Sequence, residues 1–94
     1  MEVRFAQSAR KHRIGRARVL RVIGDPTVFV ELPGPEGSDD RLVFLGDDGT
    51  GRVLEVMGVR IQGGILIIHV MDIRPKWREL YEEGRNAEEA NGEG

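Results

Sequence analysis

The sequence predicts a single α+β domain in which an antiparallel β-sheet is covered by helices packed mainly on one side. Three observations support this prediction. A long apolar hairpin occupies the second half of the chain, helical spacing of apolar residues is confined to segments near the two ends, and 94 residues suffice for one modest hydrophobic core. The expected element order is strand, helix, helix, four strands and a final helix.

The hairpin is the centre of the predicted sheet. Residues 53–61 and 65–73 are rich in β-branched and other apolar residues, and Gly63 and Gly64 between them can take the positive φ angles of a tight turn. The second run is apolar on both alternating sets of side chains, which is typical of a central strand covered on both faces. Pro75 cannot donate to a β-ladder but fits the first turn of a helix, so a terminal helix is expected to begin there.

The first half of the chain alternates between strand and helix signals. A short half-buried strand is expected at residues 1–5, where apolar and charged side chains alternate. Residues 7–24 have the apolar spacing of an amphipathic helix and should form two short helices that break near Gly15. A high content of β-branched and aromatic residues predicts strands at residues 27–32 and 41–45.

Two acidic, glycine-containing loops follow these strands. PGPEGSDD at residues 33–40 has nothing to bury, and GDDGTG at residues 46–51 lacks both the ligand spacing of an EF-hand and the lysine of a phosphate-binding loop. A plain turn is therefore the preferred interpretation of the second loop. Residues 1–84 form the predicted domain, and the polar, acidic segment 85–94 is expected to be a disordered tail.

Composition narrows the classes of function. The chain has no cysteine, which excludes disulfides and thiolate metal sites and favours a reducing compartment. No apolar run approaches the roughly 20 residues of a membrane span, and the N-terminal residues do not resemble an export signal, so we expect a cytoplasmic protein without membrane contact. An isoelectric point of about 5.7 disfavours a dedicated high-affinity DNA-binding protein.

The formal net charge of −2 conceals a strong segregation of charge. Residues 1–22 contain seven Lys and Arg against the single acid Glu2, whereas residues 23–51 contain seven Asp and Glu against Arg41 alone. The basic segment is suited to meeting phosphate or an acidic protein. A solvated helix face, balanced by the acidic loop, is an equal alternative.

Candidate functional residues are cations and proton-transfer groups, since no motif of a known enzyme class is present. Metal-independent RNA cleavage needs one group that takes the proton of the ribose 2′-hydroxyl, one that protonates the leaving oxygen, and cations that hold the charge of the phosphorane. Histidine and arginine suit these tasks. The catalytic candidates are His69, Arg74, Arg52 and His12, and the candidates for RNA or phosphate binding are Lys11, Arg13, Lys76 and Arg78.

Structural roles compete with these chemical ones. By strand alternation His69 shares a face with Ile67, and a histidine in an apolar strand is more often a hydrogen-bonded core residue than a catalyst. Trp77 and Tyr81, four residues apart, are expected to anchor the terminal helix on the sheet. Glu55 lies on a strand face and is either exposed at the rim or paired with a nearby arginine.

Three motifs resemble those of a known family: SARKHRI at residues 8–14, FLGDDGTGRVLEV at residues 44–56 and IIHVMDIRPKWRELY at residues 67–81. In this order they resemble small actinobacterial proteins related to the BrnT-like toxins, within the RelE-type toxin superfamily. The resemblance implies a compact RelE-like α+β fold with an antiparallel sheet, RNA cleavage that arrests translation, and neutralisation by a DNA-binding antitoxin encoded alongside. The matching positions are Lys11, His12, Gly51, Arg52, Arg74, Lys76 and Arg78.

The leading hypothesis is therefore the toxin component of a type II toxin–antitoxin system, an endoribonuclease that acts on mRNA without metal or cofactor. In this hypothesis Arg52 and Arg74 bind the scissile phosphate, and His69 or His12 transfers protons. Lys11 and Lys76 hold flanking phosphates. The Arg74→Ala variant should then lose toxicity with its thermal midpoint nearly unchanged. The alternative is a non-catalytic interaction module whose basic helices dock an acidic partner, or whose strand edge takes up a partner strand.

Overall fold

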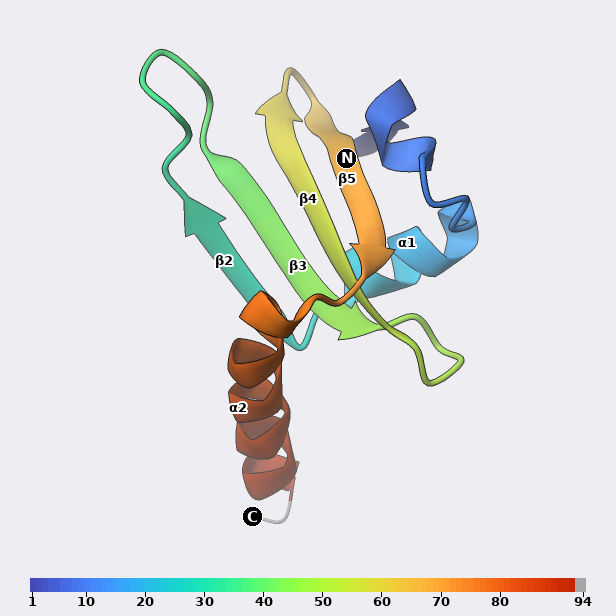
Figure 1. Cartoon of the computed structure of the whole chain (residues 1–94), viewed down its shortest axis with the longest axis vertical. Coiled ribbons are helices and arrows are strands. Elements are labelled where there is room, and N and C mark those ends of the chain that lie inside the picture. Colours follow the sequence, from blue (N-terminus) through green and yellow to red (C-terminus); the bar gives the residue numbers. More distant parts are fainter. Residues whose placement is uncertain (93–94) are drawn as a thin grey trace.

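The computed structural model describes residues 1–92 and has the predicted α+β architecture, with a five-stranded sheet and two α-helices (Figure 1). The elements in chain order are β1 (Glu2–Phe5), the 3-10 helix η1 (Gln7–Arg10), α1 (Arg16–Gly24), β2 (Val28–Leu32), β3 (Arg41–Asp47), β4 (Val53–Ile61), β5 (Gly64–Asp72) and α2 (Pro75–Gly92). The first of the two short helices expected near the N-terminus is thus a single 3-10 turn.

The strands lie in the order β1-β5-β4-β3-β2, so the β4–β5 hairpin is central, as predicted. The pairs from β2 to β5 are antiparallel, but β1 pairs with β5 in parallel. A parallel neighbour cannot be reached through a tight turn. Here the long route through η1, α1 and the remaining strands brings β5 back alongside β1, and the sheet is mixed rather than purely antiparallel.

The two α-helices lie on opposite faces of the sheet, so the prediction that helices pack mainly on one side is wrong. Val19 and Val22 of α1 are fully buried on one face, whereas Tyr81 of α2 is buried on the other. Figure 1 shows α1 passing behind the sheet. Because neighbouring side chains of a strand point to opposite faces, Leu42 packs with α1 and Val43 with α2. The sheet is therefore apolar on both sides, and each helix packs against one of them.

A β-bulge between Met57 and Gly58 changes the alternation of side chains along β5. Met57 pairs with His69 but Gly58 pairs with Ile67, so Ile68 is an extra residue between them. Ile67 is consequently buried on the α1 face, while His69 lies on the α2 face beside Met57. The prediction that Ile67 and His69 share a face is wrong because it assumed an unbroken ladder.

Helix α2 continues to Gly92, so residues 85–92 are helical where the sequence suggests a disordered tail; residues 93–94 lie outside the described part of the chain. Gly84 permits close packing instead of ending the helix, because a Cβ there would lie 2.5 Å from a methyl group of Val28. Beyond it, Arg85 pairs with Glu82 at 3.1 Å one turn away. The predicted anchoring by Tyr81 is confirmed by its burial.

Candidate functional site

Glu55, the third residue of β4, is the centre of a polar cluster on the α2 face. Its side chain is 0 % exposed, and it accepts five hydrogen bonds from two residues. Arg74 donates from its backbone N–H at 2.8 Å, from Nε at 3.0 and 2.9 Å, and from Nη2 at 2.6 Å. His69 Nε2 lies 2.9 Å from Oε2. The interpretation of Glu55 as an arginine-paired residue is confirmed, and the rim-exposed alternative is wrong.

The junction between β5 and α2 places Arg74 over this carboxylate. The N–H of Ile73 still bonds to the carbonyl of Val53 at 3.0 Å, so the ladder is held up to that point. Pro75 then starts α2, and it restricts the residue before it to extended conformations. The carbonyl of Arg74 accepts a 3.0 Å bond from the N–H of Trp77 in the first helical turn. Both the backbone and the side chain of Arg74 are thereby oriented.

Glu55 is held in its ionised form. Burial by itself raises the pKa of this carboxyl, but the hydrogen bonds and charge of Arg74, together with the hydrogen bond from His69, lower it below the usual value. The reciprocal interaction raises the pKa of Arg74. A buried charge persists when it is paired and fully hydrogen-bonded. The cluster therefore consists of the charged, buried carboxylate of Glu55 and two partly exposed partners, the permanent cation Arg74 and His69.

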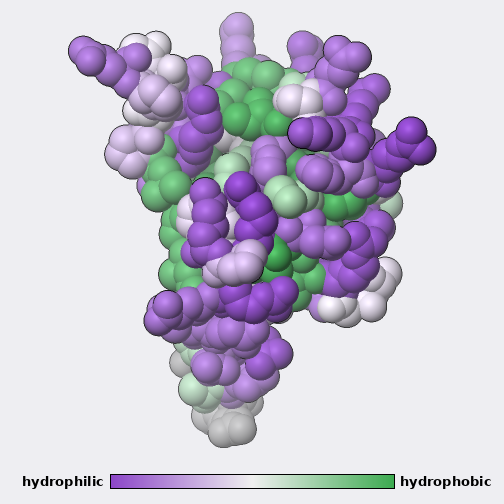
Figure 2. Space-filling model, in the orientation of Figure 1, coloured by the Kyte–Doolittle hydropathy of each residue, from purple (hydrophilic) through white to green (hydrophobic). Residues whose placement is uncertain are grey.

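Helix α2 leaves an open part of this sheet face, which Figure 2 shows from the front with hydrophobic side chains visible between polar ones. Solutes can reach two of the three residues from this open half of the α2 face. The side chain of His69 is 28 % exposed and that of Arg74 is 37 % exposed, whereas that of Glu55 is inaccessible. Half-buried Met57 and Met71 are the strand-pairing neighbours of His69 and Glu55. A ligand on this face would meet a proton-transfer group and a cation on a largely apolar floor.

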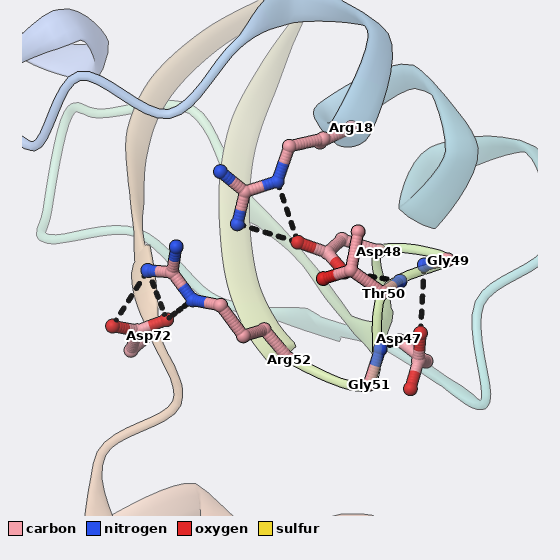
Figure 3. A network of polar contacts seen from close by, with 8 residues as sticks. All are labelled: Arg18, Asp47, Asp48, Gly49, Thr50, Gly51, Arg52 and Asp72. Atoms are coloured by element: carbon pink, nitrogen blue, oxygen red, sulfur yellow. Dashed lines mark hydrogen bonds and ion pairs between the residues drawn. The ribbon is translucent and has the colours of Figure 1, made fainter.

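Arg52 is not part of this cluster. It forms an exposed ion pair with Asp72, with Nε and Nη2 of Arg52 at 2.7 to 3.0 Å from the carboxylate (Figure 3). Asp72 pairs in register with Leu54, whose side chain is buried against α1, so the ion pair lies on the α1 side of the sheet. The structure therefore brings His69 and Arg74 together but does not place Arg52 with them.

The remaining candidates lie at the surface. Lys11, His12 and Arg13 are exposed in the turn after η1, where Arg13 has a left-handed φ of 54°. This turn follows a helix that is fixed to β5, since Ser8 Oγ donates to the carbonyl of Ile68 at 2.8 Å. On the first turns of α2, the ammonium of Lys76 lies 5.3 Å from the ring centre of Trp77, and Arg78 lies 3.9 Å from Glu82.

Asp48 forms a second buried carboxylate cluster, at the GDDGTG turn. Its Oδ2 lies 2.6 Å from Nε and 2.5 Å from Nη2 of Arg18 on α1, and its Oδ1 accepts bonds from the backbone N–H and hydroxyl of Thr50 (Figure 3). Burial opposes ionisation, but these contacts lower the pKa of Asp48 to about 2. The adjacent Asp47 accepts bonds from two backbone N–H groups of the same turn. These contacts agree with a plain turn, pinned to α1.

Sequence reasoning did not include Glu55 or Asp48 among the functional candidates. Glu55 carries a recognisable signal, the single carboxylate of a mostly apolar central strand, but its partners are fourteen and nineteen residues away. Asp48 has no comparable signal, because aspartate is common in turns. Within residues 1–92, no group of three His, Asp or Glu side chains is arranged to hold a metal ion. No helix in this range is long and apolar enough to cross a membrane.

Comparison with known proteins identified no relative of this chain. No protein-family model matches the chain, and the comparisons with curated proteins and with solved structures gave no match. What the fold and the site define is an α+β protein with a Glu–Arg–His cluster on the open half of one sheet face. Any functional assignment has to begin from the chemistry of that cluster.

Proposed function

We propose that this protein is a toxin-like endoribonuclease that cleaves mRNA without a metal ion. The observation that carries the proposal is the Glu55 cluster. It puts a histidine and an arginine within hydrogen-bond distance of one buried carboxylate, and both remain accessible from the open half of the α2 face. In RNA cleavage the ribose 2′-hydroxyl attacks the neighbouring phosphate, and this reaction requires a proton acceptor and a cation. His69 and Arg74 supply these two groups.

In the proposed reaction the 2′-oxygen forms a bond to phosphorus while the bond to the 5′-oxygen breaks, which leaves a 2′,3′-cyclic phosphate and a free 5′-hydroxyl. His69 takes the proton of the 2′-hydroxyl, and the departing 5′-oxygen takes up a proton from solvent. Glu55 engages Nε and Nη2 of Arg74, which leaves the N–H groups of Nη1 for a phosphate oxygen. Arg74 then offsets the negative charge that develops on the phosphorane.

The position of the cluster suggests how RNA would be held around it. Lys76 directly follows the Arg74–Pro75 junction, whereas the exposed basic turn at residues 11–13 lies between Ala9 and Ile14, which pack into the core on the α1 side. Lys76 is suited to a phosphate directly beside the cleaved bond, and the basic turn is suited to phosphates further along an RNA that passes the β1 edge of the sheet. The motif resemblance to BrnT-like toxins supports the same activity. It also supports placement in a type II toxin–antitoxin system, with an antitoxin protein as partner.

The direct test is RNA cleavage by the purified chain. Single-stranded RNA is incubated with micromolar protein in EDTA, and the products are analysed for 2′,3′-cyclic phosphate ends. We expect cleavage by the wild type and by Arg85→Ala, a control that removes one exposed arginine of α2. His69→Asn should slow cleavage by about 100-fold or more, the usual contribution of a general base.

The cellular counterpart is induction in a bacterial host. Growth arrest with fragmented RNA is expected for the wild type, and normal growth for a variant that combines His69→Asn with Arg74→Lys. Intact RNA in the presence of folded wild-type protein, both in the purified assay and in cells, would refute the endoribonuclease proposal.

A non-catalytic interaction module is the second candidate, and it is favoured by a different region. The edge strand β2 exposes Phe29 (48 %) and Leu32 (39 %), and within the sheet it pairs only with β3. Phe29 stacks at 5.0 Å on Phe44, and both line an open apolar cavity of about 410 Å³. An edge with apolar side chains is suited to taking up a partner strand. A stable complex with a partner protein, formed without any RNA cleavage, would select this function.

A further inference from the structure

The hydrogen bond between His69 and Glu55 determines which ring nitrogen carries the proton of neutral His69. Nε2 of His69 lies 2.9 Å from Oε2 of Glu55. An ionised carboxylate accepts hydrogen bonds and cannot donate one. The same oxygen also accepts from Nε and Nη2 of Arg74, so the carboxylate is saturated with donors and stays charged. Nε2 must therefore be the protonated nitrogen, and Nδ1 carries the free lone pair.

Glu55 has no route to a substrate. Its side chain is 0 % exposed, and both of its oxygens are engaged by donors from Arg74. It can act only through the two residues that contact it. His69, by contrast, is 28 % exposed, with the strand neighbour Met57 half-buried beside it.

We propose that Glu55 is a positioning residue, which holds neutral His69 in the Nε2–H tautomer so that Nδ1 is the atom that exchanges a proton with the substrate. This inference rests on the proposed ribonuclease function for its substrate, but the tautomer is a property of the protein alone. Carboxylate-oriented histidine is a common means of fixing a proton-transfer atom. Arg74 contributes by keeping the buried carboxylate ionised.

Nitrogen NMR of labelled histidine measures the tautomer directly. The chain has only two histidines, and His12→Asn leaves the ring signals of His69 alone. Long-range proton–nitrogen correlations at alkaline pH, where histidine is neutral, show which ring nitrogen is protonated. We expect Nε2–H in the protein with Glu55 intact. A predominant Nδ1–H form, or an equal mixture of the two forms, would overturn the proposal without any need for a Glu55 variant to fold.

Glu55→Gln tests the role of the carboxylate itself. An amide can turn its NH₂ group toward Nε2, which would then accept, so the tautomer preference should be lost or reversed. A preference that persists in folded Glu55→Gln would show that another group sets the tautomer. In the cleavage assay, Glu55→Gln should lower kcat at least about 10-fold with KM for RNA little changed, because no substrate contact is removed. A wild type that shows the Nε2–H tautomer but leaves RNA intact would refute the proposed function and not the orientation by Glu55.

Discussion

The two buried carboxylates, Asp48 and Glu55, have the same kind of arginine partner but different remaining partners. Asp48 binds Arg18 of α1 and the backbone and hydroxyl of Thr50 in its own turn. Glu55 binds Arg74, and its other partner is His69. The first cluster contains no group that transfers protons near neutral pH, whereas the second presents one to solvent. A buried ion pair thus fixes a turn in one place and orients a solvent-accessible histidine in the other.

The difference follows from where the two residues lie in the sheet. Asp48 follows the end of β3, where the chain turns and its own backbone N–H groups supply donors. Glu55 lies within β4, where the backbone is used by the ladder and side chains from the neighbouring strand and from the β5–α2 junction must supply the donors. A carboxylate within a strand recruits residues distant in sequence, and in this protein these reach an open surface.

The largest effect on stability is expected when Asp48 is removed. Asp48→Ala leaves Arg18 with a buried Nη2 that has no other partner within residues 1–92. Leaving one member of a buried pair uncompensated costs about 3–5 kcal/mol of unfolding free energy. Urea denaturation measures this loss. The control is Asp47→Ala, which removes an exposed carboxylate of the same turn and should cost about 1 kcal/mol. Equal losses of unfolding free energy for the two variants would show that the Asp48–Arg18 pair does not specifically stabilise this turn.

A somewhat smaller loss, combined with a loss of activity, is expected at Arg74. Because Arg74 supplies four of the five hydrogen bonds to Glu55, Arg74→Ala should destabilise the fold by about 2–4 kcal/mol. This replaces the sequence-based expectation of a nearly unchanged thermal midpoint. Arg74→Lys keeps the charge but loses the planar fork, so it should retain more stability and still cleave RNA poorly. Thermal unfolding and single-turnover cleavage separate the two effects, and full activity in folded Arg74→Ala would remove Arg74 from the proposed mechanism.

Much of the fold could be predicted because its signals are local. The β4–β5 hairpin follows from two apolar runs around a glycine turn, and the start of α2 follows from Pro75. The faces could not be predicted in the same way. The bulge that moves Ile67 away from the face of His69 depends on pairing between strands, and the placement of α1 and α2 on opposite faces depends on the whole sheet. Amphipathic spacing shows that a helix covers something but not which side.

The site shows the same limit. His69 and Arg74 were both predicted as candidates from their chemistry, and the structure brings them together. The sequence allows two interpretations of Glu55, which joins them, because only the neighbours across the sheet determine whether a charged strand residue is exposed or paired. Arg52 was grouped with Arg74 on the same chemical argument, yet it lies on the α1 side. Residue type was sufficient to identify the candidate residues. Strand pairing and side-chain alternation were needed to show on which face of the sheet each one lies.

The smallest effect on stability is expected for the exposed ion pair between Arg52 and Asp72. The same pair tests whether a residue on the α1 side takes part in RNA binding. Both side chains are more than half exposed, so removing either partner should change the unfolding free energy by less than about 1 kcal/mol. RNA affinity is the informative measurement. If Arg52 binds phosphate, as the sequence suggests, Asp72→Asn should tighten binding at low salt, Arg52→Ala should weaken it, and both effects should fade as salt screens the charges. If Arg52→Ala binds RNA as the wild type does at low salt, Arg52 is not a phosphate-binding residue, and Arg74 on the α2 face is the remaining arginine proposed to hold the scissile phosphate.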